Sequence, residues 1–208
     1  MLRNISEFSL SPIIQENLNA LHITSFFPVQ STLIPILLTN NRSSCIFPRD
    51  ICCSAPTGSG KTLAYAVPLI QVLHSRSIVR LRALVLLPSR ELAQQVYQVL
   101  CEVARNTGLH IGLSTGQNSF EEDEELLVGP KPPSLPSARL FSPQTYPPPP
   151  GPLGRSLVDI LVCTPGRLQD HVQYTPGFTL QHLRFLVLDE GLEYTHIYIC
   201  NLSLLFHN

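Results

Sequence analysis

The feature that most constrains the fold is a glycine-rich segment, "SAPTGSGKT" at Ser54 to Thr62, which separates two apolar stretches of different character. The short run "DICC" precedes it, and the helix-like stretch "LAYAVPLIQVLH" follows it. Gly58 and Gly60 let the backbone curl, so that successive N–H groups can point inward at an anion, and the N-terminus of the following helix adds partial positive charge. The segment therefore predicts a strand–turn–helix unit that binds phosphate.

Residues Ala55 to Thr62 follow the spacing A-x-x-x-x-G-K-T, which is the phosphate-loop pattern with alanine in place of the first glycine. In this pattern Lys61 reaches the β- and γ-phosphates of a nucleotide, and Thr62 offers its hydroxyl to Mg²⁺. A chance match in a loop is the alternative, but the flanking strand and helix favour a nucleotide site. The expected phosphate-binding residues are Ala55, Pro56, Thr57, Gly58, Ser59, Gly60, Lys61 and Thr62.

The chain has 208 residues, of which 44% are hydrophobic, and a formal net charge of −1. It is long enough to bury a core, and any nucleic-acid site must be local because the overall charge is not basic. Its six cysteines show no C-x-x-C spacing, so we expect buried free thiols in a reducing compartment and no structural metal. The N-terminal "MLRNISEFSL" has no continuous apolar core, which predicts a soluble intracellular protein without a signal peptide or membrane anchor.

Apolar periodicity predicts strands that alternate with helices along most of the chain. The strands are nearly continuous apolar runs, which is typical of parallel strands buried on both faces. We therefore predict a three-layer α/β domain with a parallel sheet, of the phosphate-loop NTPase type. The expected strands are 51–54, 83–87, 110–114, 159–163 and 184–188, and the expected helices are 11–21 (with Ser11 as its cap), 28–38, 60–74, 89–105 and 165–174.

Three segments do not fit this pattern. Residues 129–154 carry ten of the chain's nineteen prolines, which predicts a disordered excursion from one domain, with a partner-binding proline-rich segment as the alternative. The acidic run "EEDEE", Glu121 to Glu125, is interpreted as a solvated helix face. The tail at 191–208 is atypical and shows no further strand–helix repeat, so the domain is expected to span 1–190.

A second motif, "VLDE", places Asp189 and Glu190 at the end of an apolar strand. The carboxyl ends of parallel strands face the ligand crevice of an α/β sheet. Asp189 would hold Mg²⁺ directly or through water, and Glu190 would orient or deprotonate an attacking water. Taken alone, such a pair could equally be a solvated turn; with Lys61 it forms the predicted catalytic set.

Four blocks, "SAPTGSGKT", "PSRELAQQ", "TPGRL" and "LVLDE", stand in the order and approximate spacing of the first RecA-like domain of DEAD-box ATP-dependent RNA helicases, which the chain resembles. The resemblance implies an enzyme that uses ATP with Mg²⁺ and binds RNA. Upstream, "FFPVQ" resembles the glutamine motif of that family, which implies that Gln30 recognises adenine. An amide suits this role, because it can pair with the adenine amino group and a ring nitrogen together.

The resemblance also implies where RNA binds. In the family, the blocks matching 88–91 and 164–167 bind the sugar-phosphate backbone, with a glycine-containing turn between them that corresponds to 116–117. Each block starts a helix after a strand and so offers N–H groups, a hydroxyl and an arginine to phosphates, without reading base sequence. The expected RNA-binding residues are Pro88, Ser89, Arg90, Glu91, Gly116, Gln117, Thr164, Pro165, Gly166 and Arg167.

Two longer stretches, "ITSFFPVQ" and "DHVQYTPGFTLQHLRFLVLDE", are similar to the nucleolar branch of the family that works in large ribosomal subunit assembly. This similarity implies pre-ribosomal RNA as the partner and the nucleus, specifically the nucleolus, as the location.

The sequence also departs from the family pattern, because Gly191 and Leu192 follow Asp189 and Glu190 where the family has A-D. The S-A-T element and the second RecA-like domain do not follow, and that domain carries an arginine worth about 10³ to 10⁵ in rate. We therefore expect a domain incomplete at its C-terminus, without unwinding activity of its own. The alternatives are a non-catalytic, truncated nucleotide- or RNA-binding module and an unrelated phosphate-loop kinase or GTPase.

Overall fold

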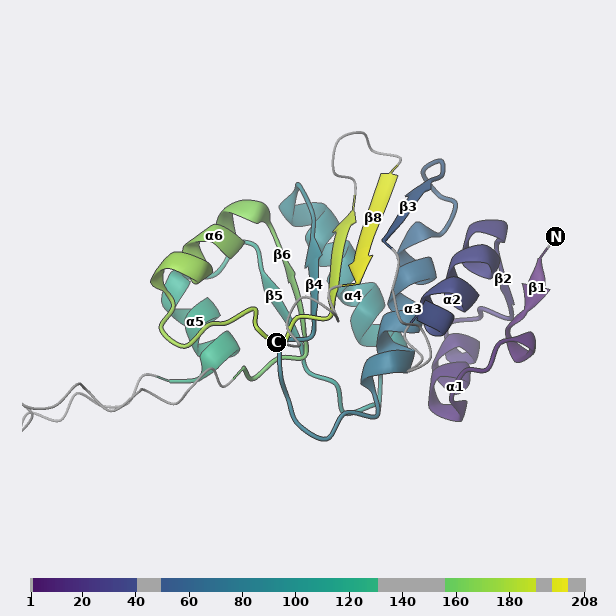
Figure 1. Ribbon diagram of the computed structural model, residues 1–208, viewed down its shortest axis with the longest axis horizontal. Helices are drawn as coiled ribbons and strands as arrows, with labels where there is room; N and C mark the ends of the chain where they lie inside the picture. Colours follow the sequence, from purple (N-terminus) through teal and green to yellow (C-terminus); the bar gives the residue numbers. More distant parts are fainter. Residues whose placement is uncertain (1, 41–49, 131–155, 190–195, 202–208) are drawn as a thin grey trace, which may run out of the picture.

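The computed structural model describes residues 2–40, 50–130, 156–189 and 196–201. Its centre is a six-stranded sheet with the order β3-β8-β7-β4-β6-β5 (Figure 1). A separate antiparallel pair, β1 with β2, lies near the N-terminus. The strands are β1 (Arg3–Asn4), β2 (Ser25–Phe26), β3 (Ile51–Ser54), β4 (Ala83–Leu86), β5 (Ile111–Ser114), β6 (Ile160–Cys163), β7 (Phe185–Asp189) and β8 (His196–Asn201).

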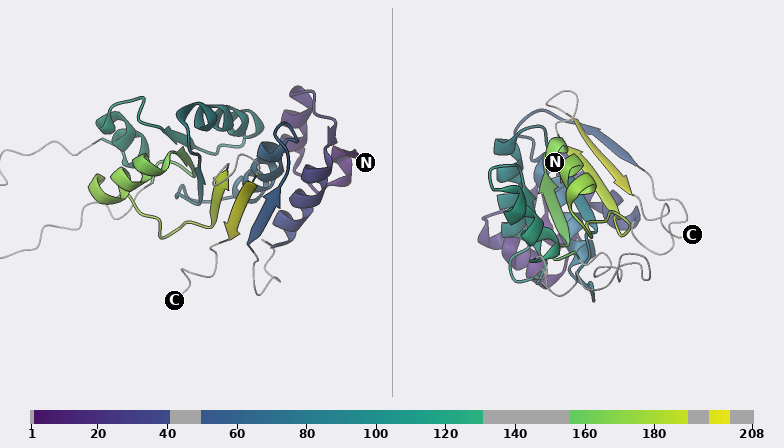
Figure 2. Two further views of the ribbon diagram at one scale, coloured as in Figure 1. Left: turned by 90° about the horizontal axis from the view of Figure 1, so that it is seen from above. Right: turned by 90° about the vertical axis from the view of Figure 1, so that its left-hand side faces the viewer.

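The helices lie at both ends of the sheet and on both of its faces. Helices α1 and α2 lie beside α3, next to β3, and α5 and α6 lie at the opposite end beside β5 and β6 (Figures 1 and 2). The helical segments are the 3₁₀ turn η1 (Ile5–Glu7), α1 (Pro12–Ala20), α2 (Pro28–Asn40), α3 (Lys61–Leu73), α4 (Arg90–Val103), α5 (Phe120–Val128) and α6 (Pro165–Tyr174).

Successive side chains along each strand point to opposite faces of the sheet, and each face has its own hydrophobic core. On β4, Ala83 and Val85 join the larger core, to which α1, α3 and α4 also contribute. Leu84 points the other way, into a smaller core with Leu127 of α5 and Leu161 of β6. Strands buried on both faces need a helical layer on each side, so the predicted three-layer α/β arrangement is confirmed.

The sheet is parallel except at one strand. Strand β4 pairs in parallel with β6 and β7, and β5 pairs in parallel with β6, as predicted. Strand β8 lies between β3 and β7 and is antiparallel to both. Parallel neighbours need a crossover of a dozen or more residues, and only residues 190–195 separate β7 from β8. The sheet is therefore mostly parallel, as predicted, and β8 is an antiparallel strand contributed by the tail at 191–208, where no strand was expected.

The predicted proline-rich excursion, 129–154, falls almost wholly outside the described residues. The described residues that flank it lie together, since the backbone N–H of Leu157 donates to the carbonyl of Leu127 at 2.8 Å. The end of α5 and the start of the segment leading to β6 are thus neighbours in the fold, and the excursion at 129–154 stays a prediction.

Other expectations need correction. In the acidic run, Asp123 and Glu124 are buried, so α5 is not a wholly solvated face. Among the described cysteines, all of them free, only Cys163 is fully buried and Cys52 is exposed. Ser11 is the N-cap residue of α1 but makes no side-chain capping hydrogen bond. No helix in the described ranges is long and apolar enough to cross a membrane.

Candidate nucleotide and RNA-backbone sites

The glycine-rich segment forms the predicted turn between β3 and α3. Gly58 and Gly60 both have φ of +80°, in the left-handed region where glycine avoids the strain that a Cβ causes. Gly60 is the N-cap residue of α3, so the free N–H groups of the first helical turn face the loop. Within the loop, the Ser59 hydroxyl is buried without a hydrogen-bond partner in the described part of the chain.

Lys61 begins α3 and folds back over the loop. Its side-chain ammonium donates to the backbone carbonyls of Ala55 at 2.8 Å and Pro56 at 3.2 Å. The residue is buried, with 7% of its surface exposed. The loop therefore carries a desolvated positive charge held by neutral carbonyls, and a phosphate oxygen would be a stronger partner for it.

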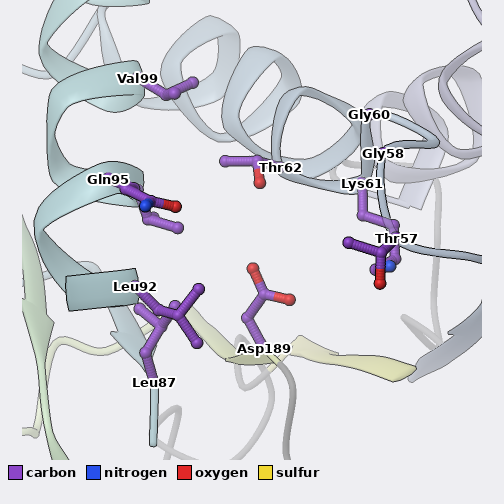
Figure 3. A pocket seen from close by; sticks show the side chains of 11 residues that line it. Thr57, Gly58, Gly60, Lys61, Thr62, Leu87, Leu92, Gln95, Val99 and Asp189 are labelled. Atoms are coloured by element: carbon purple, nitrogen blue, oxygen red, sulfur yellow. The ribbon is translucent and has the colours of Figure 1, made fainter. Parts of the chain in front are cut away.

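A pocket opens beside this loop, and Figure 3 shows how its side chains converge. Thr62 and Lys61 reach it from α3, and Asp189 reaches it from the end of β7. Helix α4 forms the opposite wall. The lining residues are Thr57, Gly58, Gly60, Lys61, Thr62, Leu87, Leu92, Gln95, Val96, Val99 and Asp189. A lysine, a hydroxyl and a carboxylate beside an unpartnered serine fit a magnesium–triphosphate group.

Asp189 is the carboxylate of this pocket. It ends β7 and is 5% exposed, and the hydroxyl of Tyr65 donates to its Oδ2 at 2.7 Å. The second predicted carboxylate, Glu190, lies outside the described residues.

Gln30 lies against the glycine turn. The N–H of Phe27 donates to its Oε1 at 2.8 Å, and its Nε2 donates to the Gly60 carbonyl at 3.0 Å. Gln30 is 1% exposed, whereas the neighbouring Phe27 is 49% exposed. Its amide keeps one further donor and one further acceptor position, although almost none of the residue is exposed.

A second, more open pocket collects most of the predicted RNA-binding residues. It lies where β4, β5 and β6 end, and because these strands are parallel their carboxyl ends share one edge of the sheet. The lining residues are Pro88, Ser89, Arg90, Glu91, Thr115, Gly116, Thr164, Gly166, Arg167 and Asp170. Of the predicted set, only Gln117 and Pro165 do not line it, and both are exposed.

The charges of this second pocket balance, since Arg90 and Arg167 are opposed by Glu91 and Asp170. An anion would therefore gain little from net charge and would bind through hydrogen-bond donors. Helices α4 and α6 both begin at this pocket, and the first backbone N–H groups of each helix supply such donors. Ser89 caps α4 by accepting from the N–H of Leu92 at 3.2 Å, which leaves its own O–H free to donate.

Arg167 is less available to a ligand than predicted. Its Nη2 donates to the carbonyl of Asn118 at 2.8 Å, and its Nε lies 3.4 Å from Asp123 Oδ2. The guanidinium lies over the Phe120 ring, with its Cζ 5.5 Å from the ring centroid. Arg167 thus links α6 to α5 and to the segment after β5. Only part of the Arg167 side chain faces the pocket.

A buried polar network continues inward from Asp123. The Ser114 hydroxyl donates to Asp123 Oδ2 at 2.7 Å and lies 2.9 Å from His171 Nε2, and His171 Nδ1 lies 2.9 Å from the Thr175 hydroxyl. Burial lowers the pKa of His171 from its usual 6.5, while the nearby Asp123 carboxylate opposes that shift. A neutral imidazole is therefore part of the support under the second pocket.

Several residues of these sites were not predicted from the sequence, of which Tyr65, Gln95 and Asp123 are the most important. Tyr65 follows Lys61 by four residues, so a helical projection from the phosphate loop would have placed both on one face. Gln95 ends the block "PSRELAQQ", in which only the first four residues predicted a role in binding. Asp123 carried no signal, because the acidic residues around it resemble a solvated surface.

Known proteins match this chain both in sequence and in fold. The family profile described as DEAD/DEAH box helicase matches residues 27–138, which is more than half of the chain. The chain therefore belongs to the DEAD/DEAH box helicase family. It is 44% identical over 186 residues to ATP-dependent RNA helicase DDX51 of Mus musculus, and 44% identical over 184 residues to DEAD-box ATP-dependent RNA helicase 1 of Arabidopsis thaliana.

These matches cover most of this chain but a minor part of its relatives. The mouse alignment covers 86% of this chain and 26% of the relative, and the Arabidopsis alignment covers 87% and 33%. The fold matches a DEAD box protein from Methanococcus jannaschii, with a TM-score of 0.65 and 23% identity over 91% of this chain and 41% of that one. It also matches S. cerevisiae Dbp5 bound to RNA and ADP BeF3, with a TM-score of 0.64 and 21% identity over 90% of this chain and 38% of that one.

Proposed function

We propose that this protein is an ATP-dependent RNA helicase and that the described residues form its ATP-binding and RNA-backbone-binding part. The observation that carries the proposal is the convergence of Lys61, Thr62 and Asp189 on one pocket beside a left-handed glycine turn. The relatives named above are described as ATP-dependent RNA helicases, which supports the same activity here.

Each residue has a role that its position supports. Lys61 would exchange the carbonyls of Ala55 and Pro56 for phosphate oxygens, and the N–H groups around Gly58 and Gly60 would complete the cradle. Bound magnesium would neutralise charge on the β- and γ-phosphates. Thr62 and Asp189 would hold that ion.

Two further roles complete the site. Gln30 would pair with adenine through its unused donor and acceptor positions. Glu190 would orient the attacking water.

RNA would lie across the second pocket through its sugar-phosphate backbone. The starts of α4 and α6, with the turn at Gly116, offer backbone donors there, and Arg90 is exposed. Contacts of this kind position a strand without reading its sequence. We further propose pre-ribosomal RNA as the bound RNA and the nucleolus as the location, on the basis of the two stretches similar to the nucleolar branch; crosslinking of RNA to the protein in cells would test both.

One observation favours a second candidate, a non-catalytic nucleotide- and RNA-binding module. Gly191 and Leu192 follow Glu190 where the family has A-D. A module of this kind would retain both pockets but would turn over no ATP.

RNA-stimulated ATP hydrolysis separates the two candidates. For an enzyme, hydrolysis by the purified chain rises when single-stranded RNA is added and is lost in Lys61→Ala, because the variant lacks the charge that meets the phosphates. Arg105→Ala, on an exposed residue away from both pockets, is the matched control and should hydrolyse ATP like the wild type. Binding of ATP and RNA without turnover would support the module instead.

A further inference from the structure

Tyr65 places a hydroxyl group inside the core of the domain. It lies on α3 four residues after Lys61, and none of its surface is exposed. Its ring packs in the larger core, and its hydroxyl donates to Oδ2 of Asp189 at 2.7 Å. Phenylalanine would fill nearly the same volume, so packing alone does not require the hydroxyl.

The bond joins the helix of the phosphate loop to the carboxylate at the end of β7. In Figure 3 that carboxylate points from β7 into the space between Thr62 and Lys61. An ionised carboxylate accepts at two oxygens. Because the Tyr65 hydroxyl is bonded to Oδ2, rotation of the carboxylate is restricted while it faces the pocket.

We propose that Tyr65 is a positioning residue for the magnesium site: its hydroxyl orients Asp189 so that the carboxylate meets the ion that accompanies the nucleotide. The inference rests on the proposed function, since it assigns Asp189 to Mg²⁺. Outer partners of metal-ligating carboxylates fix their orientation, and losing one typically costs about 10- to 100-fold in metal affinity or activity.

A purely structural role of the Tyr65 hydroxyl would have different consequences. If the hydroxyl only satisfied a buried carboxylate, its removal would lower the stability of the fold and would change nucleotide binding equally with and without magnesium. A positioning role changes the magnesium dependence specifically, because the loop that holds the phosphates is untouched.

The test uses Tyr65→Phe in the full 208-residue chain, with Tyr97→Phe as the matched control. Tyr97 lies on α4 and is partly buried beside Cys101, so its variant loses the same hydroxyl in the same helical layer. Binding of a fluorescent ATP analogue is titrated first in EDTA and then over a series of Mg²⁺ concentrations. Urea unfolding without nucleotide reports the stability of each variant.

We expect the Mg²⁺ concentration for half-maximal binding to rise about 10- to 100-fold in Tyr65→Phe, with the magnesium-free affinity unchanged. Tyr97→Phe should match the wild type in both. Combining Tyr65→Phe with Asp189→Asn should add nothing to the effect of Asp189→Asn alone, because the two residues act as one unit.

Three results would overturn the inference. They are an unchanged magnesium requirement in Tyr65→Phe, an equal loss of binding with and without magnesium, and additive effects in the double variant. If Tyr65→Phe fails to fold, the wild-type chain with 3-fluorotyrosine at residue 65 replaces it. A ¹⁹F chemical shift that does not change when Mg²⁺ is added in the presence of nucleotide would then overturn the inference. Absence of magnesium-dependent binding in the wild type removes the proposed function itself, which distinguishes the two failures.

Discussion

Gly58 and Gly60 have the same backbone conformation but different surroundings. Both have φ of +80°, yet a Cβ built on Gly58 would meet nothing within 4 Å, whereas one on Gly60 would collide with Nε2 of Gln30. Glycine is therefore needed at residue 60 for two reasons: its positive φ and the close approach of the Gln30 side chain.

Alanine substitutions separate these two requirements. Gly58→Ala should lower the free energy of unfolding by about 1–2 kcal/mol, the cost of a left-handed residue with a Cβ. Gly60→Ala should cost more, because Gln30 must also move. Gly166→Ala, in α6 with ordinary φ and open space, should change stability little. Urea unfolding measures all three, and equal costs at the first two positions would contradict the role given to Gln30.

His171 makes stability depend on pH. Burial lowers its pKa in the folded state below the usual 6.5, with Asp123 opposing the shift. The unfolded chain therefore binds more protons, so the contribution is fully present above about pH 6.5 and is lost as pH falls toward the folded-state pKa. The free energy of unfolding, measured from pH 8 to pH 5, should fall less steeply in His171→Gln than in the wild type. Parallel curves would show that His171 does not titrate differently on folding.

Residue types at fixed spacing predict much of the lining of both pockets. Lys61, Thr62 and Asp189 line one pocket, and Arg90 and Thr164 line the other. Tyr65 and Asp123 were missed for a physical reason, because their roles depend on partners 124 and 9 residues away that only the fold brings near.

At the scale of elements, β8 is the largest departure from expectation. Its sequence "HIYICN" alternates apolar and less apolar residues, as a strand does. The lack of a further strand–helix repeat predicted no strand here, but an antiparallel neighbour needs no crossover helix. Ile199 of β8 is 2% exposed and pairs with Ile51 and Val187, so the strand contributes to the core.

Truncation of Ile199 tests whether β8 belongs to the folded domain. Ile199→Ala should lower the free energy of unfolding by about 2–5 kcal/mol, the usual cost of removing a buried isoleucine. The control is Ile78→Ala, whose side chain is 61% exposed and should contribute little. Both are measured by urea unfolding of the full chain, and a negligible effect at Ile199 would mean that β8 does not pack in solution.

At the scale of the whole molecule, the order of the strands brings the two pockets together. Leu87 lines the nucleotide pocket, and the next residue, Pro88, lines the second pocket. Apolar patterning predicted the layers and the parallel strands, because both follow from burial on two faces. It could not predict that β4 lies between β6 and β7, since strand order depends on long-range pairing.

Magnesium-dependent affinity for ATP tests the central claim, that the loop at Gly58 to Lys61 cradles a triphosphate, more directly than any assay of turnover. Calorimetric titration of ATP into the folded chain should show saturable binding with one site in Mg²⁺ and much weaker binding in EDTA. A chain that is folded by circular dichroism and binds no ATP at millimolar concentration with Mg²⁺ would contradict it.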